Sequence, residues 1–389
     1  MSEWAIGRRG GDSSSASGSI SEVAAQAGAS RQWGIVGSIA VLAVFMLMLF
    51  YTTIAGWTMD YFVRAAAGEF DQISAAQSKS MFDSLVASPG RLIFWHTAVV
   101  IITVYINSRG LQAGIERAVN VLMPALFVSM LLMVAYSVTV GDIGAAARFL
   151  LTPDFSAVTW NTVLMALGQA FFSIGIAMAV MITYGSFLDR DTSIPRNAFI
   201  VVGADTLVAL LAGFAIFPIV FAHNLPLDSG AGLVFETLPI AFGDLPGGRL
   251  FGGIFFLLLI AAAITSCIGN FAPVVAWTRE KLRLSHVQAA VVAGAVMWLL
   301  GLGSVFSFNL LSGFHPLAFI SLFEGKTIYD CFDYIMSNML LPIGAFLTAV
   351  FIGWFASREG IRDEMGLEDG AGFRLWRLLI RLLLQETAH

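Results

Sequence analysis

An apolar stretch over residues 159–187 carries polar and flexible residues at its centre. It contains Gly168, Gln169, Ser173 and Gly175. Glycine destabilises a helix interior by about 1 kcal/mol relative to alanine, and a polar side chain at bilayer depth needs a partner. Together these residues predict a local unwinding between the two glycines, of the kind at which transporters bind ions and solutes. Tight helix packing through small residues would give the same composition.

Three further polar groups interrupt apolar stretches. Asp205 lies in the stretch 197–222, which has no lysine or arginine. A carboxylate at that depth costs at least about 2.5 kcal/mol, so we expect it to be paired, protonated or close to a cation. Adjacent hydroxyls of Thr265 and Ser266 could offer the oxygen ligands that hard cations prefer, although such hydroxyls usually bond back to the preceding turn. Asp333 could be an ordinary acid at a helix start.

No catalytic or cofactor motif accompanies these residues. The five histidines lack metal-ligand spacing, and the sequence has no nucleophile–base pair, P-loop or dinucleotide fingerprint. Cys267 and Cys331 lie in apolar stretches and read as buried thiols. We therefore expect neither an enzyme nor a protein with an organic cofactor.

The elements that position these groups are membrane helices. Hydrophobic residues make up 58% of the 389 residues and charged residues 12%, whereas a soluble domain has about 25% charged residues. This deficit excludes a soluble enzyme and a disordered chain, and a net charge of −5 gives no basic footprint for nucleic acid. Spans need about 20 apolar residues. We predict an all-α polytopic membrane protein with eight spans, near 33–57, 92–108, 117–139, 159–187, 197–222, 249–277, 286–303 and 328–356.

Charge in the loops predicts the orientation. If the N-terminus is cytoplasmic, the inside segments hold fifteen lysines and arginines and the outside segments hold six, so both termini of the chain are expected in the cytoplasm, at the inner (plasma) membrane. The segment 9–32 is rich in Ser, Gly and Ala and is expected to be a linker. The amphipathic segment 373–384 is expected to be an interfacial helix or the start of a further span.

Several motifs resemble those of the neurotransmitter:sodium symporter family, in particular its bacterial members, which have the LeuT-type inverted-repeat fold. GQAFFS at 168–173, with ITYGS at 182–186, is the most specific and resembles helix 6 of the family. Moderately specific similarities extend along nearly the whole chain, at 5–11 (helix 2), 50–61 (helix 3), 109–124 (helix 5), 210–218 (helix 7), 230–239 (outer loop 4), 261–266 (helix 8) and 333–345 (helix 10).

The resemblance implies a partial LeuT-type fold that comprises helices 3–10 and the ends of helices 2 and 11. Residues 1–32 would be the end of helix 2 and a cytoplasmic linker, 33–356 an eight-helix core, and 357–389 a cytoplasmic loop and the start of helix 11. No stretch resembles helix 1 of the family, which supplies much of both sodium sites. We therefore expect a chain truncated at both ends, an inactive fragment of a transporter.

The resemblance also implies the site residues. The substrate would contact Tyr51 through its carboxylate and lie beneath Phe172. Other substrate-pocket positions match Leu47, Ser173, Gly175, Met178, Cys267 and Asn270. Sodium would be held by Ser173 and Asp205 at one site and by Ala262, Thr265 and Ser266 at a second. Asp333 matches the outer-gate acid, and Glu280 is the candidate for the inner-gate acid.

Asp205 stands where the family has a helix 7 asparagine. Chloride-dependent members surround an anion with neutral groups nearby, including a serine that matches Ala209. A fixed carboxylate beside a cation site could replace that anion. The expected function is sodium-coupled, chloride-independent symport of an amino acid or a related small zwitterion, in the lipid bilayer and with a homodimer as the candidate assembly. A channel-like protein or a membrane scaffold without coupled transport is the alternative. The residues leave open whether the substrate is aliphatic or aromatic.

Overall fold

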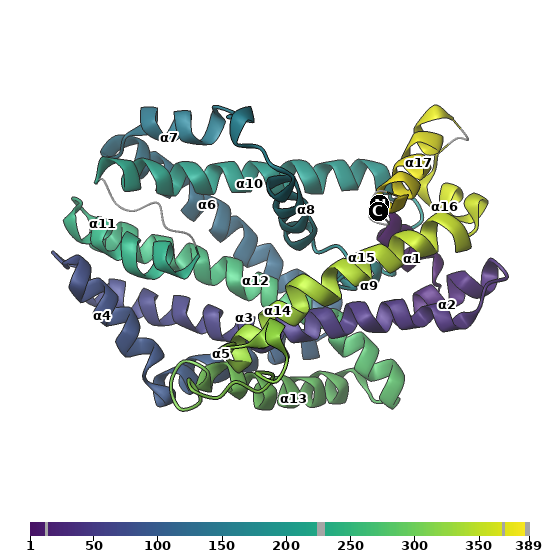
Figure 1. Cartoon of the computed structure of the whole chain (residues 1–389), viewed down its shortest axis with the longest axis horizontal. Helices are drawn as coiled ribbons and strands as arrows, with labels where there is room; N and C mark the ends of the chain where they lie inside the picture. Colours follow the sequence, from purple (N-terminus) through teal and green to yellow (C-terminus); the bar gives the residue numbers. More distant parts are fainter. Residues whose placement is uncertain (12–14, 224–229, 368–369, 386–389) are drawn as a thin grey trace.

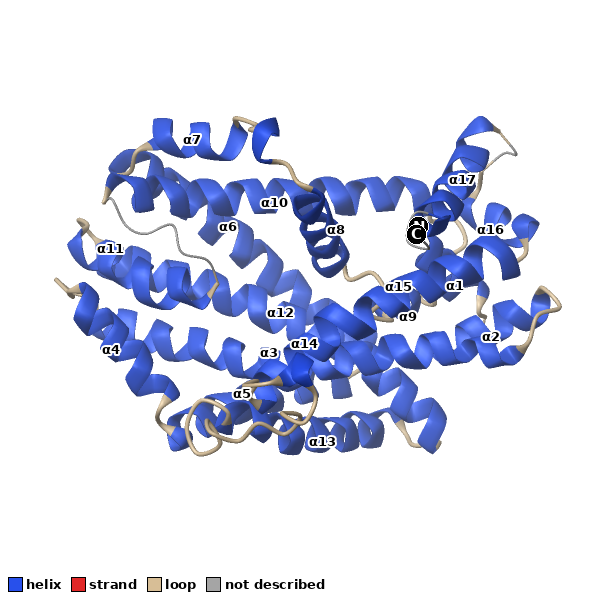
Figure 2. Ribbon diagram, viewed as in Figure 1, coloured by secondary structure: helices blue, strands red, loops and turns tan. Residues whose placement is uncertain are grey.

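The apolar stretches of the sequence form long helices, as their composition predicts. The computed structural model describes residues 1–11, 15–223, 230–367 and 370–385. Within them the chain consists of helices and loops and has no strand (Figure 2). The α-helices are α1 (Ser2–Arg9), α2 (Ala16–Gln26), α3 (Gly34–Ala67), α4 (Ala75–Val86), α5 (Pro89–Ser108), α6 (Arg117–Val140), α7 (Ile143–Leu151), α8 (Trp160–Ile174), α9 (Val180–Gly185), α10 (Ile194–Ala222), α11 (Leu238–Asp244), α12 (Gly248–Leu282), α13 (His286–Phe306), α14 (Ile328–Ile335), α15 (Leu341–Val350), α16 (Arg358–Met365) and α17 (Ala371–Gln385).

Shorter segments with different helical geometry connect or interrupt these helices. π-Helices arise where an extra residue is accommodated in a turn, and they often mark functional positions. The π-helical segments are η2 (Leu111–Glu116), η4 (Leu233–Thr237), η6 (Met336–Leu340) and η7 (Phe351–Phe355). The 3₁₀ segments are η1 (Arg31–Trp33), η3 (Phe155–Ala157) and η5 (Ser321–Phe323).

Seven helices of the described chain are long and apolar enough to cross a membrane. They correspond to seven of the eight predicted spans, and they are Arg31–Ala67, Pro89–Ser108, Leu111–Val140, Ile194–Ala222, Gly248–Leu282, His286–Phe306 and Ile328–Phe355. The eighth predicted span, 159–187, is not one continuous helix; it is divided between α8 and α9. The chain is a multi-pass membrane protein.

Helix α3 lies at the centre of the packing. It runs along α12 and also contacts α5 and α13, whereas α6 lies against both α10 and α12 (Figure 1). One buried apolar cluster surrounds Leu47 in the first half of α3, and a second surrounds Trp57 and Tyr61 in the second half. Each half of α3 thus contributes to a different apolar cluster, and the helix connects the two clusters.

A buried carboxylate fastens α5 to α3. The Asp60 side chain is fully buried and accepts hydrogen bonds from Arg64 Nε at 2.6 Å, Arg91 Nε at 2.5 Å and Trp95 Nε1 at 2.8 Å. Burying a charge is costly unless it is paired and hydrogen-bonded. These three donors offset that cost and explain how an acid persists inside a helix that is otherwise apolar.

The expectation of a linker at 9–32 is wrong for residues 16–26, which form α2. Ile20, Val23 and Ala24 recur at helical spacing and are buried, and α2 packs along α3. The Ser15 side chain caps the helix by accepting from the Gly18 amide at 3.0 Å. The Ser-, Gly- and Ala-rich composition of this segment hid the helical spacing of its apolar residues.

The segment 373–384 lies within α17. This helix packs against α15 and η7. Arg381 donates to the Gly353 carbonyl through Nε at 2.9 Å and through a terminal nitrogen at 2.8 Å. The π-helix η7 frees that carbonyl from regular α-helical bonding, so the arginines of α17 bind backbone at the end of a span.

Candidate functional site

The predicted helix interruption lies a few residues later than expected. Helix α8 continues to Ile174, so Gly168 and Gln169 are helical, and the break spans residues 175–179. Within it Gly175, Ala177 and Ala179 have φ of 76°, 63° and 61°, a left-handed region that alanine seldom occupies. The glycine ends α8, and the two alanines carry the strain before α9 begins.

A hydrogen bond joins two predicted sodium ligands at this break. Ser173 Oγ, in the last turn of α8, donates to Asp205 Oδ1 of α10 at 2.6 Å. Asp205 is partly exposed and Ser173 is exposed. Two oxygen-bearing side chains from different helices therefore meet at a helix end, where the last carbonyls have no partner within the helix. These oxygen atoms are the kind of ligand that a hard cation prefers.

Glu3, on α1, also contacts this break. The sequence analysis did not identify it. Its Oε1 accepts from the Ala177 amide at 2.8 Å. Its Oε2 is buried and has no hydrogen-bond partner among the described residues. The available signal was an acid within the apolar segment SEWAIG at 2–7. The carboxylate replaces a backbone acceptor that the broken helix has lost.

The second group of predicted residues lies on α3 and α12. Thr265 Oγ1 donates to the Ala261 carbonyl at 2.8 Å and to the Ala262 carbonyl at 3.0 Å, which is the usual bond to the preceding turn. The Tyr51 hydroxyl of α3 and the Ser266 hydroxyl of α12 lie near each other across the two helices. The structure thus brings Tyr51, Ala262, Thr265 and Ser266 together.

A cavity of about 570 Å³ lies beside this group, between α3, α12 and the loop that leads into η4. Tyr51 and Ala262 line it, together with Ile54, Trp57 and Thr58. Its volume lies within the usual range for small-molecule sites. Trp57 has a buried indole nitrogen without a partner among the described residues. The helical spacing of Tyr51, Ile54 and Thr58 was a signal for this face that the sequence analysis did not use.

The remaining predicted substrate residues do not share this cavity. Leu47, Met178 and Cys267 are buried at 2%, 1% and 0% exposure in one apolar cluster. Phe172 is 41% exposed on α8 and does not line the cavity. Asn270 is half-buried on α12. The described structure therefore divides the predicted pocket between an open cavity and a closed apolar core.

The two predicted gate acids lie at opposite ends of their helices. Asp333, near the start of the span Ile328–Phe355, is half-buried and accepts from Ser337 Oγ at 3.1 Å, directly before the π-helix η6. Glu280 is exposed near the end of α12 and lines a cavity of about 970 Å³. The cations Arg31, Arg279 and Lys281 line that cavity as well, so Glu280 lies among basic side chains.

Comparison with known proteins gives consistent matches. Residues 77–385 match the sodium:neurotransmitter symporter family. The uncharacterized sodium-dependent transporter YhdH of Bacillus subtilis is 35% identical over 355 residues, which cover 90% of this chain and 77% of the relative. An uncharacterized sodium-dependent transporter of Haemophilus influenzae is 32% identical over 354 residues, with 90% and 76% covered.

A solved structure agrees with these sequence matches. The crystal structure of MhsT in complex with L-phenylalanine superposes with a TM-score of 0.86 at 35% sequence identity, and the match covers 98% of this chain and 84% of that chain. MhsT has the LeuT-type fold, so the fold expected from the sequence motifs is confirmed.

Proposed function

Because the chain belongs to the sodium:neurotransmitter symporter family, we propose that it carries an amino acid across the membrane, driven by the sodium gradient. The observation that carries this proposal is the contact of Ser173 with Asp205 beside the 175–179 break. A sodium ion there would gain one full negative charge, a hydroxyl oxygen and the carbonyls of a helix end. Broken helices with these groups are the usual ion sites of such transporters.

Binding of the amino acid is proposed at the cavity next to Tyr51 and Ser266. Tyr51 lines the cavity with its hydroxyl near Ser266, and this hydroxyl is the group expected to receive the substrate carboxylate. The walls of this cavity are mainly apolar, and Leu47 and Met178 form the buried core nearby. We propose an apolar amino acid as the substrate class. The phenylalanine bound to MhsT fits this class.

Transport is proposed to need no chloride. Asp205 supplies a fixed negative charge at the break. Two unit charges 4 Å apart interact by about 4 kcal/mol at an effective dielectric constant of 20, so the carboxylate alone could balance a sodium ion. Ala209, one turn further along α10, has no hydroxyl that could hold an anion. The basic loops are proposed to face the cytoplasm, in accord with the loop charges.

Uptake by the purified protein in liposomes tests the proposal against the expectation of an inactive fragment, which would show no sodium-driven uptake. We expect saturable uptake of a radiolabelled apolar amino acid when sodium is outside, and its loss when sodium is replaced by choline or when an ionophore collapses the gradient. Gluconate in place of chloride should leave uptake unchanged. Flux that does not saturate and persists without the gradient would support a channel instead, and uptake indifferent to sodium would refute symport.

A further inference from the structure

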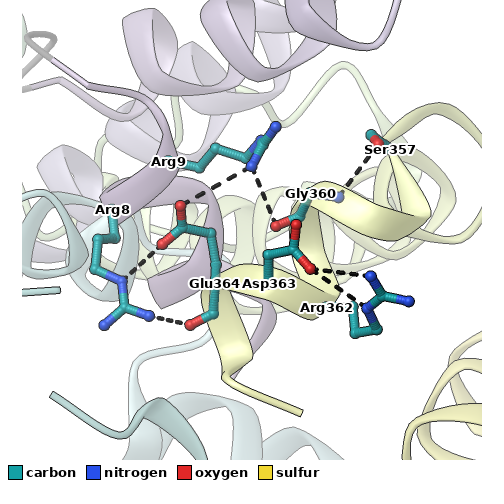
Figure 3. A network of polar contacts seen from close by, with 7 residues as sticks. All are labelled: Arg8, Arg9, Ser357, Gly360, Arg362, Asp363 and Glu364. Carbon is teal, nitrogen blue, oxygen red and sulfur yellow. Dashed lines mark hydrogen bonds and ion pairs between the residues drawn. The ribbon is translucent and has the colours of Figure 1, made fainter. Parts of the chain in front are cut away.

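Arg8, at the end of α1, joins three segments that are far apart in the sequence. Its Nε donates to Glu364 Oε2 of α16 at 2.8 Å, and a terminal nitrogen donates to the Glu364 carbonyl (Figure 3). Another terminal nitrogen donates to the carbonyls of Thr192 at 2.7 Å and Asp189 at 3.1 Å, in the loop after α9. The Arg8 side chain is only 7% exposed, so this guanidinium is a buried junction.

Helices α1 and α9 behave as one body because glycines bring them into close contact. A Cβ at Gly185 of α9 would lie 2.7 Å from the Trp4 carbonyl of α1, and a Cβ at Gly7 would collide with the Ile182 carbonyl. Packing this tight leaves no room for one helix to slide on the other. Since α9 follows the 175–179 break, any movement of α9 carries α1 and Arg8 with it.

Besides α2, which packs on both α1 and α3, helix α16 connects this body to the central helices. It packs on α1, while α15, which precedes it, packs on α3. Arg9 adds to the contact by donating to the Gly360 carbonyl at 3.3 Å (Figure 3). The π-helix η7 separates α15 from α16. The Arg8–Glu364 contact is therefore a point at which the α1–α9 body is tied to helices that contact α3.

We propose that Arg8 and Glu364 form a latch that holds the cytoplasmic side closed and must part when that side opens. This inference rests on the proposed function, because alternating access needs one group of helices to move against another. Separation would leave the buried guanidinium with only its two backbone carbonyls and the partly buried Glu364 carboxylate without Arg8 until water reaches them, which favours the closed state. The latch is separate from Glu280, which lies on α12. Arg8 is a positioning residue, since it acts on the site only through α9.

Two cysteine reporters distinguish a latch from a merely structural contact. Thr183 of α9 is 1% exposed, so a thiol there reacts only when α9 leaves its neighbours. Thr58 lines the cavity beside Tyr51, on the other side of the site. Thr183→Cys and Thr58→Cys are labelled separately with a charged maleimide in nanodiscs, where the reagent reaches both faces. In Arg8→Ala we expect labelling at position 183 to become about tenfold faster and labelling at position 58 to become slower. A tenfold change corresponds to a shift of about 1.4 kcal/mol in the equilibrium between the closed and the open state of the cytoplasmic side.

Arg362→Ala is the matched control, because among the described residues the Arg362 side chain pairs with its neighbour Asp363 on α16 alone, at 3.1 Å; it should leave both rates unchanged. Glu364→Gln keeps the size of the side chain and should shift the rates in the same directions as Arg8→Ala, so it serves if the alanine variant does not fold. Unchanged rates, or faster labelling at both positions, would overturn the latch. Labelling needs no transport, so failure of the proposed function would appear separately, as absent sodium-driven uptake by the unsubstituted protein.

Discussion

Replacing Asp205 by asparagine removes the charge on which the proposed sodium site depends. In the structure Asp205 accepts a 2.6 Å hydrogen bond from Ser173, and asparagine can accept the same bond. The change therefore isolates charge from geometry. Unit charges 4 Å apart interact by about 4 kcal/mol, which is the upper limit for the loss of sodium-binding free energy. This limit corresponds to a loss of sodium affinity of about a thousandfold. Asparagine retains an oxygen dipole, so we expect sodium affinity to fall roughly 10- to 100-fold, a loss of about 1.4 to 2.7 kcal/mol.

The assay measures uptake as a function of sodium concentration, with chloride or gluconate as the anion. We expect the half-saturating sodium concentration of Asp205→Asn to rise by the stated factor in gluconate. Asp191→Asn makes the same chemical change at an exposed loop position and should behave like the unsubstituted protein. If Asp205→Asn retains its uptake and its sodium dependence without chloride, the carboxylate is not part of the cation site and the electrostatic argument is wrong.

Three other substitutions test separate parts of the structure. Tyr51→Phe removes a hydroxyl from the lining of the proposed substrate cavity; the apparent affinity for the amino acid should weaken about tenfold, the equivalent of one hydrogen bond, while sodium binding measured with ²²Na⁺ persists. Gly185→Ala introduces a Cβ against the backbone of α1 and should destabilise the protein by about 1–3 kcal/mol in thermal unfolding, whereas Gly203→Ala, with no atom within 4 Å, should not. Asp60→Asn removes the buried charge that pairs with Arg64 and Arg91, although Arg64 keeps Glu69 as a partner; it should cost about 1.5–3 kcal/mol, seen as a lower melting temperature, and an unchanged melting temperature would mean that the network contributes little.

The long helices were predictable because the bilayer imposes a length and a composition on each span. Seven predicted stretches lie within helices that satisfy both conditions, and only their ends differ; α3, for example, extends ten residues beyond the predicted end, to Ala67. That extension contains Asp60 and Arg64. A span predicted from hydropathy ends where charged residues begin. In the structure Asp60 and Arg64 pair with each other, and the helix continues past them.

The position of the helix break was less accessible to sequence reasoning. Gly168 lies inside α8 with no atom within 4 Å of its Cβ position, so no close contact there requires a glycine or interrupts the helix. The break begins instead at Gly175, and the left-handed residues Ala177 and Ala179 carry no sequence signal, because alanine favours helix. Their conformation depends on tertiary contacts, such as the Glu3 carboxylate on the Ala177 amide.

The two carboxylates at the break have different physical roles. Glu3 is buried, and one oxygen accepts from a backbone amide that the helix no longer satisfies, so it compensates for the interruption itself. Among the described residues the Asp205 side chain bonds the Ser173 hydroxyl, which can rotate away, and it is partly exposed, so in the proposed site its charge would be available to an arriving cation. Glutamine could replace Glu3 and still accept from the amide, whereas asparagine could not replace the charge of Asp205. The site therefore needs the shape of one acid and the charge of the other, and only the second should alter the sodium dependence.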